Sequence, residues 1–175
     1  RVIYLAMPYS NPDPAVRAQS RASLLAALPP PNATNWNRAA IAATLPAQPT
    51  LGHIAFAQSC VQCHALQGEG KAVGPDLATV GARTSAELIL AILEPNAAIE
   101  PRYLRYFAET TDADAISGIL KDESEEELTL IQGSGVEVRI PWTELTSLRV
   151  SNYSFMPEGL DQGLTDQGLA DLAAY

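Results

Sequence analysis

The chain has 175 residues, of which 47% are hydrophobic and 18% charged, so it is long and apolar enough to bury a core in one domain, or one domain with an appendage. Its formal net charge of -9 and pI of about 4.6 argue against nucleic acid and anionic membranes as partners. It contains no apolar run of about 18 residues, so the sequence predicts no membrane span.

Residues 1–49 are rich in alanine and proline and are predicted to form an N-terminal helical arm or the remnant of a preceding domain. Residues 13–28 are expected to be one helix, with Asp13 as its N-cap and Pro14 at the first helical position. Residues 35–45 form a second, shorter helical pattern. This segment alone is too small for a core.

The next part of the chain is also predicted to be helical, with loops between the helices. Residues 50–64 have a helical pattern up to the cysteines, and residues 68–77 form a loop rich in glycine and proline. A further helix over residues 84–95 begins with a capping box, in which Thr84 is the N-cap and Glu87 follows three residues later.

After this helix the hydrophobic period changes from helical to strand-like. The strand-like runs are residues 103–110, 115–120, 127–131, 136–140 and 145–150. They predict a small antiparallel insert at about residues 103–150 within a helical domain that covers residues 50–175. Residues 164–175 are expected to be the last helix, capped by Thr165. The predicted fold class is therefore mainly α with a small β insert.

The stretch SCVQCHALQGEG places Cys60, Cys63 and His64 in one short run, although the chain has only two cysteines and two histidines. C-x-x-C-H is the attachment motif of c-type haem. Two thiols three residues apart on a helical turn can each add to one vinyl group of the porphyrin, and the next residue then points its imidazole at the iron. The sequence predicts one covalently bound haem c, with His64 as an iron ligand.

Three other interpretations of the cysteines fit less well. A disulfide between Cys60 and Cys63 would leave His64 unexplained, and a thioredoxin-type pair expects a βαβ context that this sequence lacks. A structural zinc site needs four ligands, for which only His53 and carboxylates remain.

The iron then needs a sixth ligand, or stays open. The candidates are Met156, Met7 and His53. Met156 precedes Pro157 in an extended stretch, from which a loop can carry a thioether to the far face of a haem. His53 belongs to the same predicted helix as His64 and cannot easily reach the opposite face, which favours Met156.

Other polar residues are weaker candidates. Arg83, Arg102, Tyr103 and Trp142 could donate hydrogen bonds to haem propionates, although a role in the scaffold is the more ordinary explanation for each. The acidic run at residues 121–127 could steer a basic partner, but such runs are usually solvated turns.

These motifs resemble class I c-type cytochromes, and more closely the haem-binding cytochrome c domain of planctomycete and verrucomicrobial multidomain secreted proteins. The resemblance covers about residues 50–175 and rests on CVQCH, GEGKAVGPDL, ILEPNAAIEPRY, the strand-rich insert and SFMPEGLDQGLTDQGLADLAAY. It implies the class I helical fold around a haem, although small members of the family have a shorter loop before the methionine.

The resemblance also implies roles for particular residues. Cys60 and Cys63 would carry the thioether links, His64 would be the proximal ligand and Met156 the distal one. The carbonyl of Pro75 would accept a hydrogen bond from the non-ligating nitrogen of His64, which fixes the ring and raises its basicity.

A helix contact follows from the same resemblance, because the first and last helices of such a fold cross. Gly52 and Phe56 would meet Leu169, Leu172 and Tyr175 there, as ordinary core packing.

The function expected from these features is electron transfer, without enzymatic activity. A dehydrogenase domain, fused or separate, would donate the electron, and another cytochrome or an oxidase would accept it. Haem attachment by this motif places the protein in the periplasm or an equivalent compartment. The alternatives are a haem-based gas or redox sensor with a displaceable methionine and a peroxidase-like enzyme with a five-coordinate haem.

Overall fold

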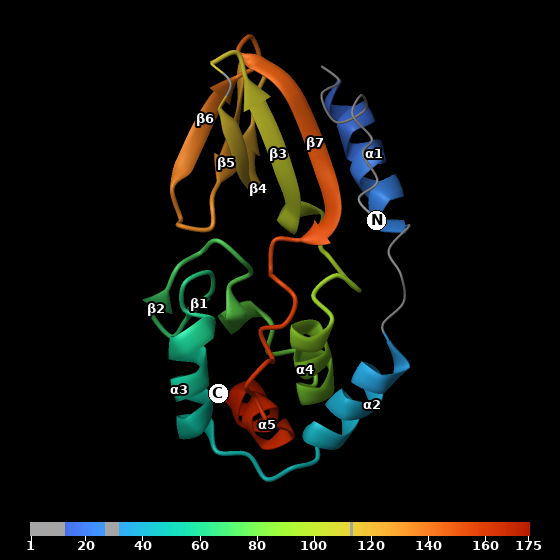
Figure 1. The fold of residues 1–175 in the computed structure, drawn as a ribbon, viewed down its shortest axis with the longest axis vertical. Helices are drawn as coiled ribbons and strands as arrows, with labels where there is room; N and C mark the ends of the chain where they lie inside the picture. Colours follow the sequence, from blue (N-terminus) through green and yellow to red (C-terminus); the bar gives the residue numbers. More distant parts are fainter. Residues whose placement is uncertain (1–12, 27–31, 113) are drawn as a thin grey trace. The chain divides into compact units, whose positions relative to one another are not determined.

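The computed structural model describes residues 13–26, 32–112 and 114–175, which pack into two compact units (Figure 1). One combines Arg1–Leu28 with Ile99–Phe155 and is called here the sheet unit. The other combines Pro29–Ala98 with Met156–Tyr175 and is called the helical unit.

The sheet unit is built around a five-stranded antiparallel sheet in the order β6-β5-β4-β3-β7. Its elements are α1 (Pro14–Ala26), the 3-10 helix η2 (Pro101–Tyr103), β3 (Leu104–Thr110), β4 (Ala115–Glu123), β5 (Glu127–Ile131), β6 (Glu137–Pro141) and β7 (Leu145–Ser154).

The two edge strands, β6 and β7, are consecutive in the chain and are joined by residues 142–144 alone. A flat five-stranded sheet would hold its edges roughly 19 Å apart. The short connection spans at most about 14 Å, so the sheet must curl towards a partly open barrel. Irregular pairing in β3 and β4 breaks the register and allows the strands to bend.

The buried face of this sheet holds its own hydrophobic core. Buried residues alternate along β3, where Leu104, Tyr106 and Ala108 point inward, as expected for a strand with one buried face. The core cluster consists of Ile99, Leu104, Tyr106, Ala108, Leu128, Leu130, Ile140, Leu148 and Val150.

The prediction of a mainly α fold is wrong. Helix makes up 36% of the structure and strand 26%, and the sheet is a compact unit with its own core. The strand-like runs were recognised, but polar residues hid their length. Residues 121–123 looked like a turn yet continue β4, and residues 151–154 continue β7. A strand needs apolar residues only on its buried face, so solvent-facing charges do not end it.

The helical unit contains four helices and a small hairpin among its described residues. Its elements are α2 (Ala33–Ala42), α3 (Pro49–Ser59), β1 (Ala65–Leu66), β2 (Glu69–Gly70), the 3-10 helix η1 (Leu77–Thr79), α4 (Ser85–Leu93) and α5 (Asp166–Ala174). The predicted caps are confirmed: Thr84 and Glu87 form a capping box, and the Thr165 side chain accepts a hydrogen bond from the backbone of Gly168.

Helices α3 and α5 cross at close range. A Cβ atom on Gly52 would lie 2.0 Å from the carbonyl oxygen of Asp171, so only glycine fits there. The rings of Phe56 and Tyr175 lie 5.5 Å apart. The predicted contact between these helices is confirmed for Gly52, Phe56 and Tyr175, whereas Leu169 packs in a cluster with α2 and α4.

Arg38 connects helix α2 to the segment that leads into α5. Its guanidinium donates to Asp161 at 2.6 Å, to Asp166 at 2.8 Å and to the carbonyl of Leu164 at 3.2 Å. The hydrogen bonds that Arg38 donates to Asp166 and Asp161 raise its pKa. Residues 1–49 thus contribute α1 to one unit and α2 to the other. Their origin as an arm or a domain remnant stays a prediction.

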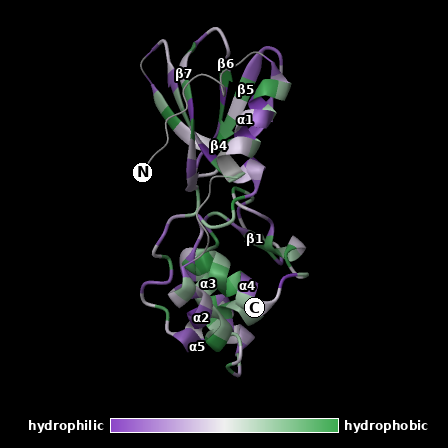
Figure 2. Cartoon of the chain, turned by 90° about the vertical axis from the view of Figure 1, so that its right-hand side faces the viewer, coloured by the Kyte–Doolittle hydropathy of each residue, from purple (hydrophilic) through white to green (hydrophobic). Residues whose placement is uncertain are grey.

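The helices that the structure describes are short. Figure 2 shows apolar stretches in α3 and α4. Within the described residues, no helix is long and apolar enough to cross a membrane.

Candidate functional site

The two cysteines and His64 lie on one tight turn that follows α3. The helix ends at Ser59, and the N–H of Cys60 still donates to the carbonyl of Phe56 at 2.8 Å. The N–H groups of Cys63 and His64 both donate to the carbonyl of Cys60, at 3.1 and 2.9 Å. These bonds keep the turn helical, so both thiols and the imidazole project from one turn.

Both cysteines are free thiols and half-buried. Burial raises the pKa of Cys60, and the neighbouring Cys63 raises it further. The Cys60 thiol is therefore neutral at pH 7. No group of three or more His, Cys, Asp or Glu side chains in the described part of the chain could hold a metal ion. The thiols thus have neither a mutual bond nor the ligand set that a structural zinc site needs.

A small hairpin of β1 and β2 follows the turn that carries the cysteines and packs against it. Strands β1 and β2 pair with Leu66 opposite Glu69, and the two linking residues, Gln67 and Gly68, have positive φ of 51° and 86°. This matches the two-residue type I′ turn. A Cβ atom on Gly70 would lie 2.0 Å from the carbonyl oxygen of His64. Sequence analysis missed the hairpin and treated its second strand as loop.

The imidazole of His64 is held on two sides. Its Nδ1 lies 2.8 Å from the carbonyl oxygen of Pro75. A carbonyl can only accept, so Nδ1 donates in this contact and Nε2 is the ring nitrogen left for a ligand. A Cβ atom on Gly74 would lie 2.7 Å from Cε1 of this ring. The expected contact with Pro75 is present, and its role towards a cofactor remains a prediction.

The loop that carries Gly74 and Pro75 is fixed to the turn itself. The N–H groups of Val73 and Gly74 donate to the carbonyl of Cys63 at 3.1 and 2.7 Å. The ring and the loop that orients it are therefore parts of one hydrogen-bonded structure. Sequence analysis did not single out Gly74, although its place next to a proline in a loop was a usable signal.

His53 has a different partner. Its Nε2 lies 3.0 Å from a carboxylate oxygen of Glu69 on the hairpin, and its ring lies 5.0 Å from that of Tyr175. Its side chain is 43% exposed. The imidazole thus links α3 to β2, which agrees with its exclusion as the opposite ligand of a haem. Met7, the third candidate ligand, lies outside the described residues.

Met156 belongs to the helical unit and is half-buried. It follows β7 directly and precedes a turn in which Gly159 has a φ of 82° and its carbonyl accepts from Gln162 at 3.0 Å. The Glu158 carboxylate accepts a hydrogen bond from Asn96, just after α4. The loop with Met156 is therefore fixed within the same unit that contains His64.

The remaining candidates are divided between the two units. Arg83 is exposed in the turn before α4 of the helical unit. Tyr103, Arg102 and Trp142 belong to the sheet unit. There Arg102 stacks over the ring of Tyr103 at 4.9 Å, and the indole N–H of Trp142 donates to the carbonyl of Ser124 at 3.0 Å.

The side chains present fit a covalently attached haem. Two free thiols project from one turn, and the next residue offers an imidazole nitrogen whose opposite nitrogen is fixed by a carbonyl. That hydrogen bond sets the tautomer and raises the basicity of the ligand. A thioether that could bind as a further ligand is available in the same unit at Met156.

Comparison with known proteins agrees with this chemistry. Residues 50–129 match the family model of cytochrome c. No curated protein matches the chain. The matched segment contains Cys60, Cys63, His64 and Pro75 and ends before Met156. The family match and the C-x-x-C-H turn together support a cytochrome c domain in this chain, with a covalent haem c and a function in electron transfer.

Proposed function

We propose that the protein carries single electrons on one haem c, with His64 and Met156 as the axial ligands. The observation that carries this proposal is the turn itself, where two free thiols and a fixed imidazole lie together. The haem supplies the reversible one-electron change between ferrous and ferric iron.

The residues of the chain hold this group and tune it. Cys60 and Cys63 would hold the haem through thioether bonds, and the carbonyl of Pro75, 2.8 Å from Nδ1 of His64, would keep the ring in one orientation. Methionine is a soft neutral ligand that favours the ferrous form and raises the potential. If His64 and Met156 both bind the iron, they would leave no position on it for a substrate, so we infer that the chain has no enzymatic activity of its own.

The partners in this proposal are redox proteins. The donor is a dehydrogenase domain, fused or separate, and the acceptor is another cytochrome or an oxidase. The compartment is the periplasm or an equivalent space. This choice rests on the family match and on the resemblance to the haem domains of multidomain secreted proteins from planctomycetes and verrucomicrobia.

Carbon monoxide binding and redox titration of the haem-loaded chain test this function. We expect one reversible one-electron transition and no rapid binding of carbon monoxide by the reduced protein. Met156→Ala should bind the gas rapidly, which shows that it can reach the iron. Rapid binding by the unaltered protein would instead favour a sensor with a displaceable ligand.

A further inference from the structure

Two arginines of helix α1 contact strands β3 and β4 of the same unit. Arg17 and Arg21 are one helical turn apart, so they lie on the same face of α1. Among the side chains of α1 that the structure describes, only Arg17 is buried, and none belongs to the hydrophobic core cluster. The contacts of these described side chains are therefore ones of charge and hydrogen bonding more than of apolar burial.

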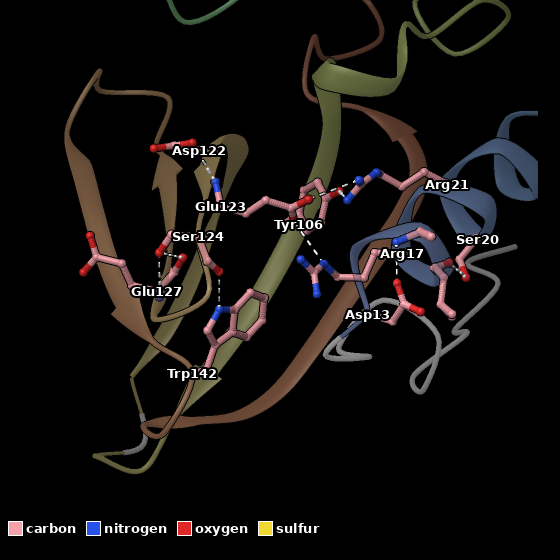
Figure 3. A network of polar contacts seen from close by, with 12 residues as sticks. Asp13, Arg17, Ser20, Arg21, Tyr106, Asp122, Glu123, Ser124, Glu127 and Trp142 are labelled. Carbon is pink, nitrogen blue, oxygen red and sulfur yellow. Dashed lines mark hydrogen bonds and ion pairs between the residues drawn. The ribbon is translucent and has the colours of Figure 1, made fainter.

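One carboxylate of the sheet receives both arginines. Arg17 Nε donates to Glu123 Oε2 at 3.1 Å, and Arg21 donates from a terminal nitrogen to Glu123 Oε1 at 3.4 Å (Figure 3). Burial by itself lowers the pKa of Arg21, but Tyr106 and Glu123 outweigh it, so the pKa is raised. Glu123 comes from the last position of β4, where the strand ends beside α1.

The environment of Arg17 is built for a guanidinium group. Its side chain is only 4% exposed, which is rare for arginine unless the charge is paired. The guanidinium carbon lies 5.2 Å from the centre of the Trp142 ring, within the range of cation–π contact. The indole N–H of Trp142 is bonded to the carbonyl of Ser124, which holds the ring in this orientation.

The second arginine lies beside open space. Arg21 donates to the hydroxyl of Tyr106 at 3.4 Å. An open pocket of about 330 Å³ adjoins it, where the carboxylates of Asp122 and Glu123 face the cations of Arg102 and Lys121 beside Tyr106 and Leu120. Helix α1 therefore does not fill the groove that it enters.

We propose that Glu123, Trp142 and Tyr106 form an arginine-recognition site, which α1 occupies within the chain and which an arginine-bearing helix of a partner protein takes when α1 leaves. The partner helix is expected to carry two arginines four positions apart, as α1 does at Arg17 and Arg21. Contacts of this polar kind resemble those of separable interfaces more than those of a permanent core. An acidic chain favours a basic partner, since its net charge of -9 attracts such a segment.

A peptide of residues 13–28, labelled with a fluorophore, is the probe for this site. It is titrated into the haem-loaded full chain and into its Arg17→Ala/Arg21→Ala variant, whose own helix no longer competes. Because α1 of the double variant no longer competes with the peptide for the site, this variant should bind the peptide on the order of ten-fold more tightly than the unaltered chain. Adding Glu123→Gln should weaken that binding by about ten-fold or more, since a charge-assisted partner is lost.

Two matched controls separate recognition from simple charge attraction. Glu125→Gln removes an exposed carboxylate in the neighbouring turn and should leave peptide binding unchanged. A peptide with lysine at both arginine positions keeps its charge but lacks the planar guanidinium, so it should bind more weakly. Equal binding of both peptides, or equal effects of the two glutamate changes, would overturn the proposal. So would the absence of binding, or dimerisation through exchange of α1 between copies.

Hydrogen exchange on the unaltered chain gives a test that needs no variant. If ion pairs hold α1, raising the salt to ~1 M should speed exchange of its amides while those of β3 and β4 keep their protection. Equal protection of α1 and the strands at both salt concentrations would show that the helix is a permanent part of the fold.

Discussion

The His64 ring lies against Gly74, which leaves room for it because glycine has no side chain. Because a Cβ atom at position 74 would lie 2.7 Å from the ring, Gly74→Ala should displace the imidazole or its loop. We expect a cost of about 1–3 kcal/mol in the free energy of unfolding, typical of overpacking, and a changed reduction potential. Chemical denaturation and redox titration of the haem-loaded variant measure these changes.

Gly81→Ala is the matched control for this change. It lies in the same unit, six residues after Pro75, and a Cβ atom there would meet nothing within 4 Å. Its stability and potential should stay close to those of the unaltered protein. If both alanine variants behave alike, the close approach of Gly74 to the ring has no role in orienting His64.

Single residues differ in how far the sequence predicted them. The contact between His64 and Pro75 was expected because both belong to recognisable motifs eleven residues apart. The pair of His53 and Glu69 was not, because it depends on how α3 and the hairpin meet. Such contacts between elements leave no local pattern in the sequence.

At the scale of elements, the crossing of α3 and α5 makes a prediction about two glycines. Gly52→Ala should destabilise the protein by about 1–3 kcal/mol, because its Cβ would overlap the backbone of α5 at Asp171. Gly168→Ala, in α5, should be neutral or stabilising by about 0.5–1 kcal/mol, since its Cβ would make ordinary contacts and alanine favours helix. Urea unfolding measures both, and destabilisation by Gly168→Ala alone would contradict this picture of the crossing.

The capping box at the start of α4 should make the free energy of unfolding depend on pH. Hydrogen bonds from the backbone and side chain of Thr84 lower the pKa of Glu87 below its ordinary value of 4.5, and Arg83 adds to this. A carboxyl with a lowered pKa in the folded state stabilises the protein above its unfolded pKa and loses this effect as the pH falls through the folded value.

A comparison with Glu87→Gln tests this dependence. The difference in unfolding free energy between the unaltered protein and the variant should shrink as the pH falls below about 4.5, as linkage requires. In a Thr84→Ala background the same substitution should show a smaller dependence. A difference that is constant with pH would mean that the capping box does not perturb Glu87.

Elements were predicted well where their pattern is local. The capping box, the last helix and the five strand-like runs all follow from residue order. The strand ends and the hairpin at β1 and β2 were missed. Two-residue strands carry no periodicity, and the positive φ of Gln67 is set by the turn and not by its residue type.

At the scale of the whole molecule, the fold class depends on whether the strands pack as a unit with their own core, which residue patterns do not show. The sheet has its own core, and the chain leaves the helical unit at Ala98 and returns at Met156. Whether a run of strands decorates a helical domain or packs as a unit depends on contacts between distant segments. That is why the correct strands still led to the wrong class.

The net charge of -9 should influence electron exchange with small oxidants. A cationic oxidant should react several-fold more slowly as the salt concentration rises, because salt screens its attraction to an acidic protein, while an anionic oxidant should react faster. Stopped-flow oxidation of the reduced protein measures both rates. Identical salt dependence for the two oxidants would show that the charges of the chain do not influence electron exchange.

The most direct test of the account is the optical spectrum of the purified protein, oxidised and reduced, with a denatured pyridine adduct. We predict a c-type adduct and the weak long-wavelength band of ferric iron bonded to a thioether. That band should disappear in Met156→Ala and persist in Met7→Leu, which changes the only other methionine. A protein without haem, or a high-spin spectrum without this band, would contradict a covalent haem c held by His64 and Met156.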